Sequence, residues 1–425
     1  MHNKSSKNLI QLHVSQLKLG MYVSELDKSW LETPFAVQGI QLHSQKDIDS
    51  ISEYATFVWI DPLKQAPHTM ETLRTINPAD SNHKTTSKLK LSGSIASEKS
   101  RKEYPKLNSA AAEHKAAKSL YFQGKTAIKN ILHRVSDLNE IAVDDARALV
   151  NGCMESVIRN PDALMWMSKI REQDEYTAEH CLNVCILAMV FGRHLGLSEK
   201  EIVRLGLCGL LHDVGKMKMP VDILNKPSKL SADEFDVIKR HTLTGYNLLK
   251  ESSSFIPPIV AEVARSHHEQ MDGSGYPAGI PAGDLNDMVR MISLVDAYDA
   301  MTSDRCYSKG KSNTDALKLI YEQKGKQFDE ELALEFIRCI GIYPAGTLVQ
   351  LINGLIGVVI EINQQYRHLP KVLILRDAAG NKVNPFVLNL LDVECGDLSS
   401  EHLVRCTLKN RAQGIDISAY ISPSL

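Results

Sequence analysis

The sequence lacks the features that mark several protein classes. Its 8 cysteines are scattered, with no Cys-x-x-Cys pair and no compact disulfide framework, which suits a reducing cytoplasm. With 49 basic and 51 acidic residues the formal net charge is -2, so nothing favours a nucleic acid polymer or a membrane surface as the main partner. No stretch approaches the roughly 18 consecutive apolar residues of a membrane span, and the N-terminus has no apolar core of signal-peptide length. We therefore expect a soluble, cytoplasmic protein without membrane insertion.

Composition divides the 425 residues into modules. Residues 1–65 alternate short apolar runs with turn signals, which predicts a small N-terminal α+β module; we expect this module to be regulatory. Residues 66–108 are rich in Ser, Thr, Lys, Asn and Pro, a composition typical of a flexible linker. Residues 109–343 carry apolar side chains at helical spacing and predict a helical domain. Residues 344–400 predict a small β-rich module, followed by a tail over 401–425, so the expected fold class is mainly α.

Local signals mark the ends of individual elements. Ser198 before Glu201 and Ser231 before Glu234 each predict a capping box at a helix start. The stretches GTLVQLINGLIGVVIEI and PKVLILRD predict strands, with turns at Gly354 and in DAAGN.

The helical region contains an unusual number of potential metal ligands. Neutral imidazole and carboxylate are accepted by Fe, Mn, Co, Ni and Zn, whereas Mg and Ca prefer oxygen alone. A lone histidine on an apolar helix is usually a core or surface residue, but adjacent His-Asp and His-His pairs inside apolar segments are not explained that way, because a buried Asp needs a cation partner. The count favours a binuclear site, and the candidates are five histidines and two aspartates: His180, His212, Asp213, His241, His267, His268 and Asp296.

Four motifs in this region resemble those of the HD-GYP family, a subgroup of the HD metal-dependent phosphohydrolases. They are HDVGK at 212–216, KRHTLTGYNLL around His241, HHEQMDGSGYPAGI from His267, and VDAYDAMTSDR around Asp296. The resemblance covers roughly residues 165–340, and LKLGMYVSELDKSWLETPF is similar to a small module that often precedes such domains. It implies a helical HD-type metallohydrolase that hydrolyses cyclic di-GMP or 3',3'-cyclic GMP-AMP to a linear dinucleotide, and in part to mononucleotides.

The resemblance also assigns roles to residues. Asp213 would bridge two divalent ions. Fe or Mn are the metals expected first, and Ni, Co or Zn are also acceptable. His180, His212 and Asp296 would complete the coordination of one ion. The other ion would be coordinated by His241, His267 and His268. Asp213 and Lys216 are thus the catalytic candidates, and Lys216 would also contact the phosphate or a leaving oxygen.

This sequence departs from the family pattern at two places. Tyr176 stands where some members carry a Glu for a third ion, and Glu172 and Glu175 are out of register, so two ions are expected. The usual Arg-Pro-Tyr-basic run appears as RCYS at 305–308. Arg305 can still bind a phosphate, and Lys309 replaces the basic group that Ser308 lacks.

The glycine-rich stretch after the paired histidines predicts a tight turn. Gly273 and Gly275 permit backbone angles closed to other residues and Pro277 fixes the next φ, so the loop can fold behind the histidines. The Tyr276 side chain has two interpretations, an ordinary exposed turn residue or part of a protein-contact surface.

Three functions compete at this level. The first is a cyclic-dinucleotide phosphodiesterase. The second is a catalytically weak sensor or docking module that recruits a diguanylate cyclase through the Gly-Tyr-Pro loop; the complete ligand set argues against it. The third is an HD-type hydrolase of dNTP or guanosine tetraphosphate; HDVGK alone would allow it, but HHEQMDGSGYP argues against it.

Overall fold

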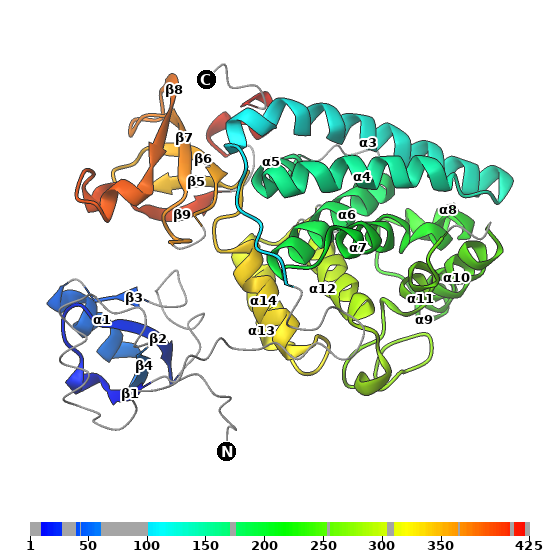
Figure 1. The fold of residues 1–425 in the computed structure, drawn as a ribbon, viewed down its shortest axis with the longest axis horizontal. Coiled ribbons are helices and arrows are strands. Elements are labelled where there is room, and N and C mark those ends of the chain that lie inside the picture. Colours follow the sequence, from blue (N-terminus) through cyan, green and yellow to red (C-terminus); the bar gives the residue numbers. More distant parts are fainter. Residues whose placement is uncertain are drawn as a thin grey trace. The chain divides into compact units, whose positions relative to one another are not determined.

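The computed structural model describes residues 10–27, 40–42, 44–60, 101–170, 176–252, 256–303, 310–363, 366–408 and 412–420. The chain divides into two compact units, residues 1–90 and residues 91–425. Figure 1 shows their helices and strands.

The first unit is a small α+β module. Its four-stranded antiparallel sheet has the order β1-β4-β2-β3, and one helix accompanies it. Val23 of β2, Ile51 of α1 and Val58 of β4 are fully buried in its core, so the helix and the sheet share one apolar core. The elements are β1 (Ile10–His13), β2 (Tyr22–Leu26), β3 (Ile40–Gln41), α1 (Gln45–Tyr54) and β4 (Phe57–Ile60).

The second unit is mainly helical, as expected. The capping boxes predicted at Ser198 and Ser231 are confirmed, each with the Glu three residues on bonding back to the cap. The helices are α3 (Ala110–Leu138), α4 (Val143–Arg159), α5 (Pro161–Met167), α6 (Tyr176–His194), α7 (Glu199–Leu211), α8 (Val221–Leu224), α9 (Ala232–Lys239), α10 (His241–Glu251), α11 (Pro258–Ser266), α12 (Asp287–Thr302), α13 (Asn313–Glu322) and α14 (Glu330–Ile340).

Helix α6 is the centre of the helical unit. Residues 178–193 are all buried, because α6 is apolar around its whole circumference and neighbours cover it on every side. It packs against α3, α4, α5, α7, α12 and α14 (Figure 1). A polar side chain near the start of α6 therefore lies inside the protein and needs partners there.

A five-stranded antiparallel sheet of order β8-β7-β6-β5-β9 follows the helices in the sequence. The turns predicted at Gly354 and in DAAGN are confirmed, with Gly354 at φ 87° and Gly380 at φ 86°. The sheet extends past the expected boundary at residue 400, because β9 lies inside the predicted tail and pairs with β5. Its five residues, VRCTL, are half-buried or exposed, so no apolar run marked the strand. The strands are β5 (Leu348–Leu351), β6 (Ile356–Glu361), β7 (Lys371–Arg376), β8 (Lys382–Asn389) and β9 (Val404–Leu408).

The end of the expected linker, residues 101–108, is bonded to the helical unit. The Arg193 guanidinium donates to the carbonyls of Tyr104 (2.6 Å) and Pro105 (3.2 Å). The Lys106 ammonium lies 2.6 Å from Asp162 of α5 and 3.3 Å from Glu361 of β6. The composition of the segment gave no sign of this strap, because its partners, such as Arg193, Asp162 and Glu361, lie far along the chain.

Among the described residues, none of the helices has both the length and the apolar character needed to cross a bilayer.

Candidate metal centre

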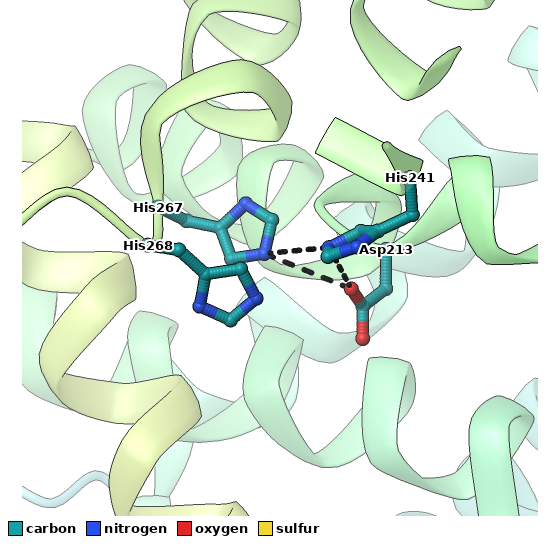
Figure 2. Close-up of side chains that lie close together, drawn as sticks. All are labelled: Asp213, His241, His267 and His268. Atoms are coloured by element: carbon teal, nitrogen blue, oxygen red, sulfur yellow. Dashed lines mark hydrogen bonds and ion pairs between the residues drawn. The ribbon is translucent and has the colours of Figure 1, made fainter. Parts of the chain in front are cut away.

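Helix ends bring the seven candidate ligands together. His180 lies in the first turn of α6, His212 and Asp213 directly follow α7, and His241 begins α10. His267 and His268 directly follow α11, and Asp296 lies within α12. His212, Asp213, His241 and His267 are at most 1% exposed. Figure 2 shows Asp213 facing His241 and His267, with His268 beside them.

The two carboxylate oxygens of Asp213 face different sets of imidazoles. Oδ2 lies 3.3 Å from His212 Nε2 and 3.6 Å from His180 Nε2. Oδ1 lies 3.3 Å from His241 Nε2 and 3.7 Å from His267 Nε2 (Figure 2). Two donor atoms that each sit about 2.1 Å from one ion are roughly 3.0–3.4 Å apart. The 3.3 Å distances on each oxygen match this spacing, and the other two are slightly longer, so the cluster has the geometry of a metal-binding group centred on Asp213.

Asp296 adds its carboxylate on the His180 side. Its Oδ1 lies 3.0 Å from His180 Nε2 and 3.8 Å from His212 Nε2. Its Oδ2 lies 4.0 Å from His268 Nδ1. Asp296 thus stands between the two histidine sets and is nearest to His180.

The outer ring nitrogens fix the direction of four imidazoles. His212 Nδ1 donates to Gly209 O (2.8 Å) and His241 Nδ1 donates to Ile238 O (2.7 Å). His267 Nδ1 donates to Ala264 O (3.1 Å), and His180 Nδ1 lies 2.8 Å from Asp299 Oδ2. A carbonyl can only accept, so in the neutral rings the proton is on Nδ1 and the Nε2 lone pair points into the cluster.

The cluster fits divalent cations. His212 Nε2 and Asp213 Oδ1 are buried without a hydrogen-bond partner among the described residues, which is costly unless something else occupies that space. Three groups of His and Asp have ligand atoms within 4.8 Å of one another, and Asp213 belongs to two of them. Aligned lone pairs, an orphaned carboxylate oxygen and a nitrogen-oxygen donor set are what a transition-metal ion requires.

Electrostatics keep the acids ionised. Burial alone would raise the pKa of Asp213, but Lys216 and His212 hold it well below its usual value. The pKa of Asp296 is likewise lowered, against the effect of burial, by His180. Burial would lower the pKa of His180, yet Asp296 and Asp299 raise it to about 9. Both acids are therefore anionic donors at neutral pH, and a metal must displace a proton from His180.

A close approach of two backbones places Asp213 beside His241. The 3-10 turn after Asp213, Val214–Lys218, packs on α10. A Cβ at Gly215 would overlap the carbonyl oxygen of His241 and the backbone nitrogen of Gly245. Only glycine leaves room for this contact, which explains its place in HDVGK.

The glycine-rich loop folds back onto the paired histidines, as predicted. Gly273 has φ 77°, and a Cβ at Gly275 would overlap the backbone of His268, Glu269 and Gln270. The Tyr276 N–H donates to His268 O at 3.2 Å, and the two rings stack with centroids 4.7 Å apart at 31°. Tyr276 is thus a wall of the site, a role that neither of its two sequence interpretations included.

The remaining candidates divide into described and undescribed residues. The Lys216 ammonium bonds Asp213 Oδ2 and its side chain is 23% exposed, so it lies beside the cluster as expected. Arg305, Lys309 and Ser308 lie outside the described residues, as do Glu172 and Glu175; the side chain of Tyr176 is not described either.

Two acids that support the site were missed. Asp299 holds His180, and Glu269 accepts from the backbone N–H groups of Ala278 (2.8 Å) and Ile280 (3.1 Å), which ties down the loop. The sequence carried a signal for Asp299, because it follows Asp296 by three residues and such pairs share a helix face.

Comparison with known proteins agrees with this geometry. Residues 162–332 match the family model described as an HD domain, and residues 9–146 match a domain of unknown function, DUF3391. The chain is 34% identical over 379 residues to a cyclic di-GMP phosphodiesterase of Pseudomonas aeruginosa, covering 87% of this chain and 86% of that protein.

Two further relatives match over shorter stretches. The cyclic di-GMP phosphodiesterase response regulator RpfG of Xanthomonas campestris is 36% identical over 160 residues, which covers 38% of this chain and 42% of that protein. The 3'3'-cGAMP-specific phosphodiesterase 2 of Vibrio cholerae is 30% identical over 163 residues, which covers 38% of this chain and 31% of that protein.

Proposed function

Because this chain belongs to the HD-GYP family of metal-dependent phosphohydrolases, we propose that it hydrolyses a cyclic dinucleotide, cyclic di-GMP or 3',3'-cyclic GMP-AMP, to a linear dinucleotide. The observation that carries the proposal is the Asp213 carboxylate, whose two oxygens face separate pairs of histidines. A phosphodiester is anionic and repels nucleophiles, so its hydrolysis needs this density of cation-binding groups.

The ligand roles proposed here are those expected from the sequence, and the distances of His180, His212, His241 and His267 from the two Asp213 oxygens support them. We assign His180, His212 and Asp296 to one divalent ion and His241, His267 and His268 to a second. Asp213 is shared between them. Two ions held there would neutralise the phosphate and supply a nucleophile at neutral pH. Imidazole with carboxylate suits Fe or Mn, and Ni, Co or Zn accept the same set.

The chain's own residues orient and stabilise the substrate. Lys216 is the described cation nearest the shared carboxylate, and its ammonium offers N–H donors to a phosphate oxygen or to the departing 3'-oxygen. Arg305 and Lys309 keep their assignment as phosphate ligands from the sequence. The Tyr276 ring and the burial of His267 exclude water from one side of the cluster. Recruitment of a diguanylate cyclase through the Gly-Tyr-Pro loop is a separate proposal on which hydrolysis does not depend.

A direct assay tests the function. Protein stripped with a chelator and reloaded with Mn or Fe should convert cyclic di-GMP, 3',3'-cyclic GMP-AMP or both into a linear dinucleotide, resolved by chromatography. Elemental analysis should give about two ions per chain. A folded protein that carries two ions and leaves both substrates intact would contradict the proposal.

A further inference from the structure

An aromatic and cationic cluster extends outward from His268. The Tyr276 ring stacks on His268 at 4.7 Å, and Phe235 of α9 meets Tyr276 edge-on at 6.1 Å. The Lys239 ammonium lies 4.8 Å from the Phe235 ring centre and 5.8 Å from that of Tyr276. Phe235 and Lys239 are four residues apart on α9 and so share one face of the helix. The cluster is defined by Phe235, Lys239 and Tyr276.

Core packing does not account for this cluster. Helix α9 has no buried residue, although it lies beside α10, which begins with His241 (Figure 1). Phe235 is 44% exposed, and the side chain of Lys239 is 34% exposed while it pairs with Asp236. An aromatic face and a cation are therefore open to solvent immediately beside the metal centre.

We propose that Phe235, Lys239 and Tyr276 form the binding subsite for one nucleobase of the cyclic dinucleotide; this rests on the proposed function. A nucleotide holds its base one sugar away from its phosphate, so a phosphate bound at the histidine cluster leaves its base to contact side chains that lie just outside the cluster, such as Tyr276 and Phe235. Stacking of a base on an aromatic side chain contributes about 1–3 kcal/mol. The Lys239 charge adds attraction for an anionic substrate and for the electron-rich face of a base.

The subsite makes a definite statement about specificity. Every base has a π face, so stacking tolerates guanine and adenine alike. The cluster should strengthen the binding of cyclic di-GMP and 3',3'-cyclic GMP-AMP by similar factors and leave the choice between them to contacts elsewhere.

The test replaces the ring and keeps the packing. Phe235→Leu retains an apolar side chain on α9 but removes the stacking surface. Phe122→Leu is the matched control, because Phe122 is 38% exposed and meets Tyr121 edge-on at 6.1 Å in α3. Each variant is assayed with both cyclic dinucleotides and with ethyl p-nitrophenyl phosphate, a phosphodiester without a base. A cyclic dinucleotide that carries 2-aminopurine should report stacking directly, because its fluorescence should fall when the base stacks on an aromatic ring of the metal-loaded protein, as followed immediately after mixing.

We expect Phe235→Leu to raise KM for both cyclic dinucleotides by about ten-fold, with kcat and the rate on ethyl p-nitrophenyl phosphate within two-fold of the wild type. The quenching should fall in this variant and persist in Phe122→Leu. Unchanged KM and unchanged quenching in Phe235→Leu would overturn the subsite, as would an equal loss on the base-free ester. If the wild type cleaves only the base-free ester, the proposed function fails instead.

Discussion

Replacing Asp299 should weaken one of the two cation positions and spare the other. The Asp299 carboxylate lies 2.8 Å from His180 Nδ1, and both side chains are at most 2% exposed. The Ser303 hydroxyl, 3.3 Å from the same oxygen, helps to fix it. A carboxylate in this place orients the imidazole and raises the basicity of the opposite nitrogen, which we assign to the ion bound by His180, His212 and Asp296.

The expected size of the effect follows from the bonds that each substitution removes. Loss of such a supporting acid lowers metal affinity by about 10–100-fold. Asp299→Asn keeps an oxygen that can accept from His180 but loses the charge, so about ten-fold is expected. Asp299→Ala loses the acceptor as well, so about 100-fold is expected.

Calorimetric titration of chelator-stripped protein with Mn separates the two positions by their affinities. Asp162→Asn is the control, because Asp162 is also 3% exposed but pairs with Lys106, away from the histidines; it should lower the melting temperature and leave both affinities unchanged. The reasoning is refuted if folded Asp299→Ala binds both ions as the wild type does, or if both positions weaken equally.

Three more outcomes are expected. Asp213→Ala should bind at most one ion and lose turnover while it stays folded; full activity in this variant would place the chemistry elsewhere. Removal of residues 1–100 should preserve hydrolysis, whereas removal of residues 1–108 should cost about 3 kcal/mol of stability, since buried Arg193 loses its carbonyl partners; equal melting temperatures would contradict this. Although burial opposes the shift, His194 and Arg338 lower the pKa of the Glu335 carboxyl to about 2. The ionised carboxylate therefore adds up to about 3 kcal/mol to the free energy of unfolding. This stabilisation is fully present above pH 4.5, the usual pKa of a Glu. It is lost as pH falls to about 2, and acid titration of Glu335→Gln should lack this loss.

Much of the fold could be predicted because its signals are local. Helical periodicity, two capping boxes and the turns at Gly354 and Gly380 each depend on a few neighbouring residues, and all are present. Strand β9 and the strap at 101–108 were not recognised. Strand β9 pairs with the distant strand β5, and the strap is bonded by side chains far along the chain, such as Arg193 and Asp162. Such long-range contacts leave no pattern among neighbouring residues.

The same distinction separates the parts of the metal centre. Residues that can bind a metal are easy to identify in the sequence, because His and Asp are uncommon in apolar helices. The structure brings all seven candidate ligands together in one cluster. The placing of Asp213 beside His241 depends on the approach of Gly215 to the His241 carbonyl, a contact between backbones that the residue types alone do not predict.

The supporting residues show what motif reading leaves out. Glu269 stands next to His268 in HHE, where its charge invites assignment as a further ligand. Its oxygens instead accept from Ala278 and Ile280, which anchors the loop that carries Tyr276 onto His268. The two glycines allow the loop to bend, and Glu269 holds it in the bent conformation. The Tyr276 ring can then pack on one face of His268, whose ring no carbonyl restrains among the described residues.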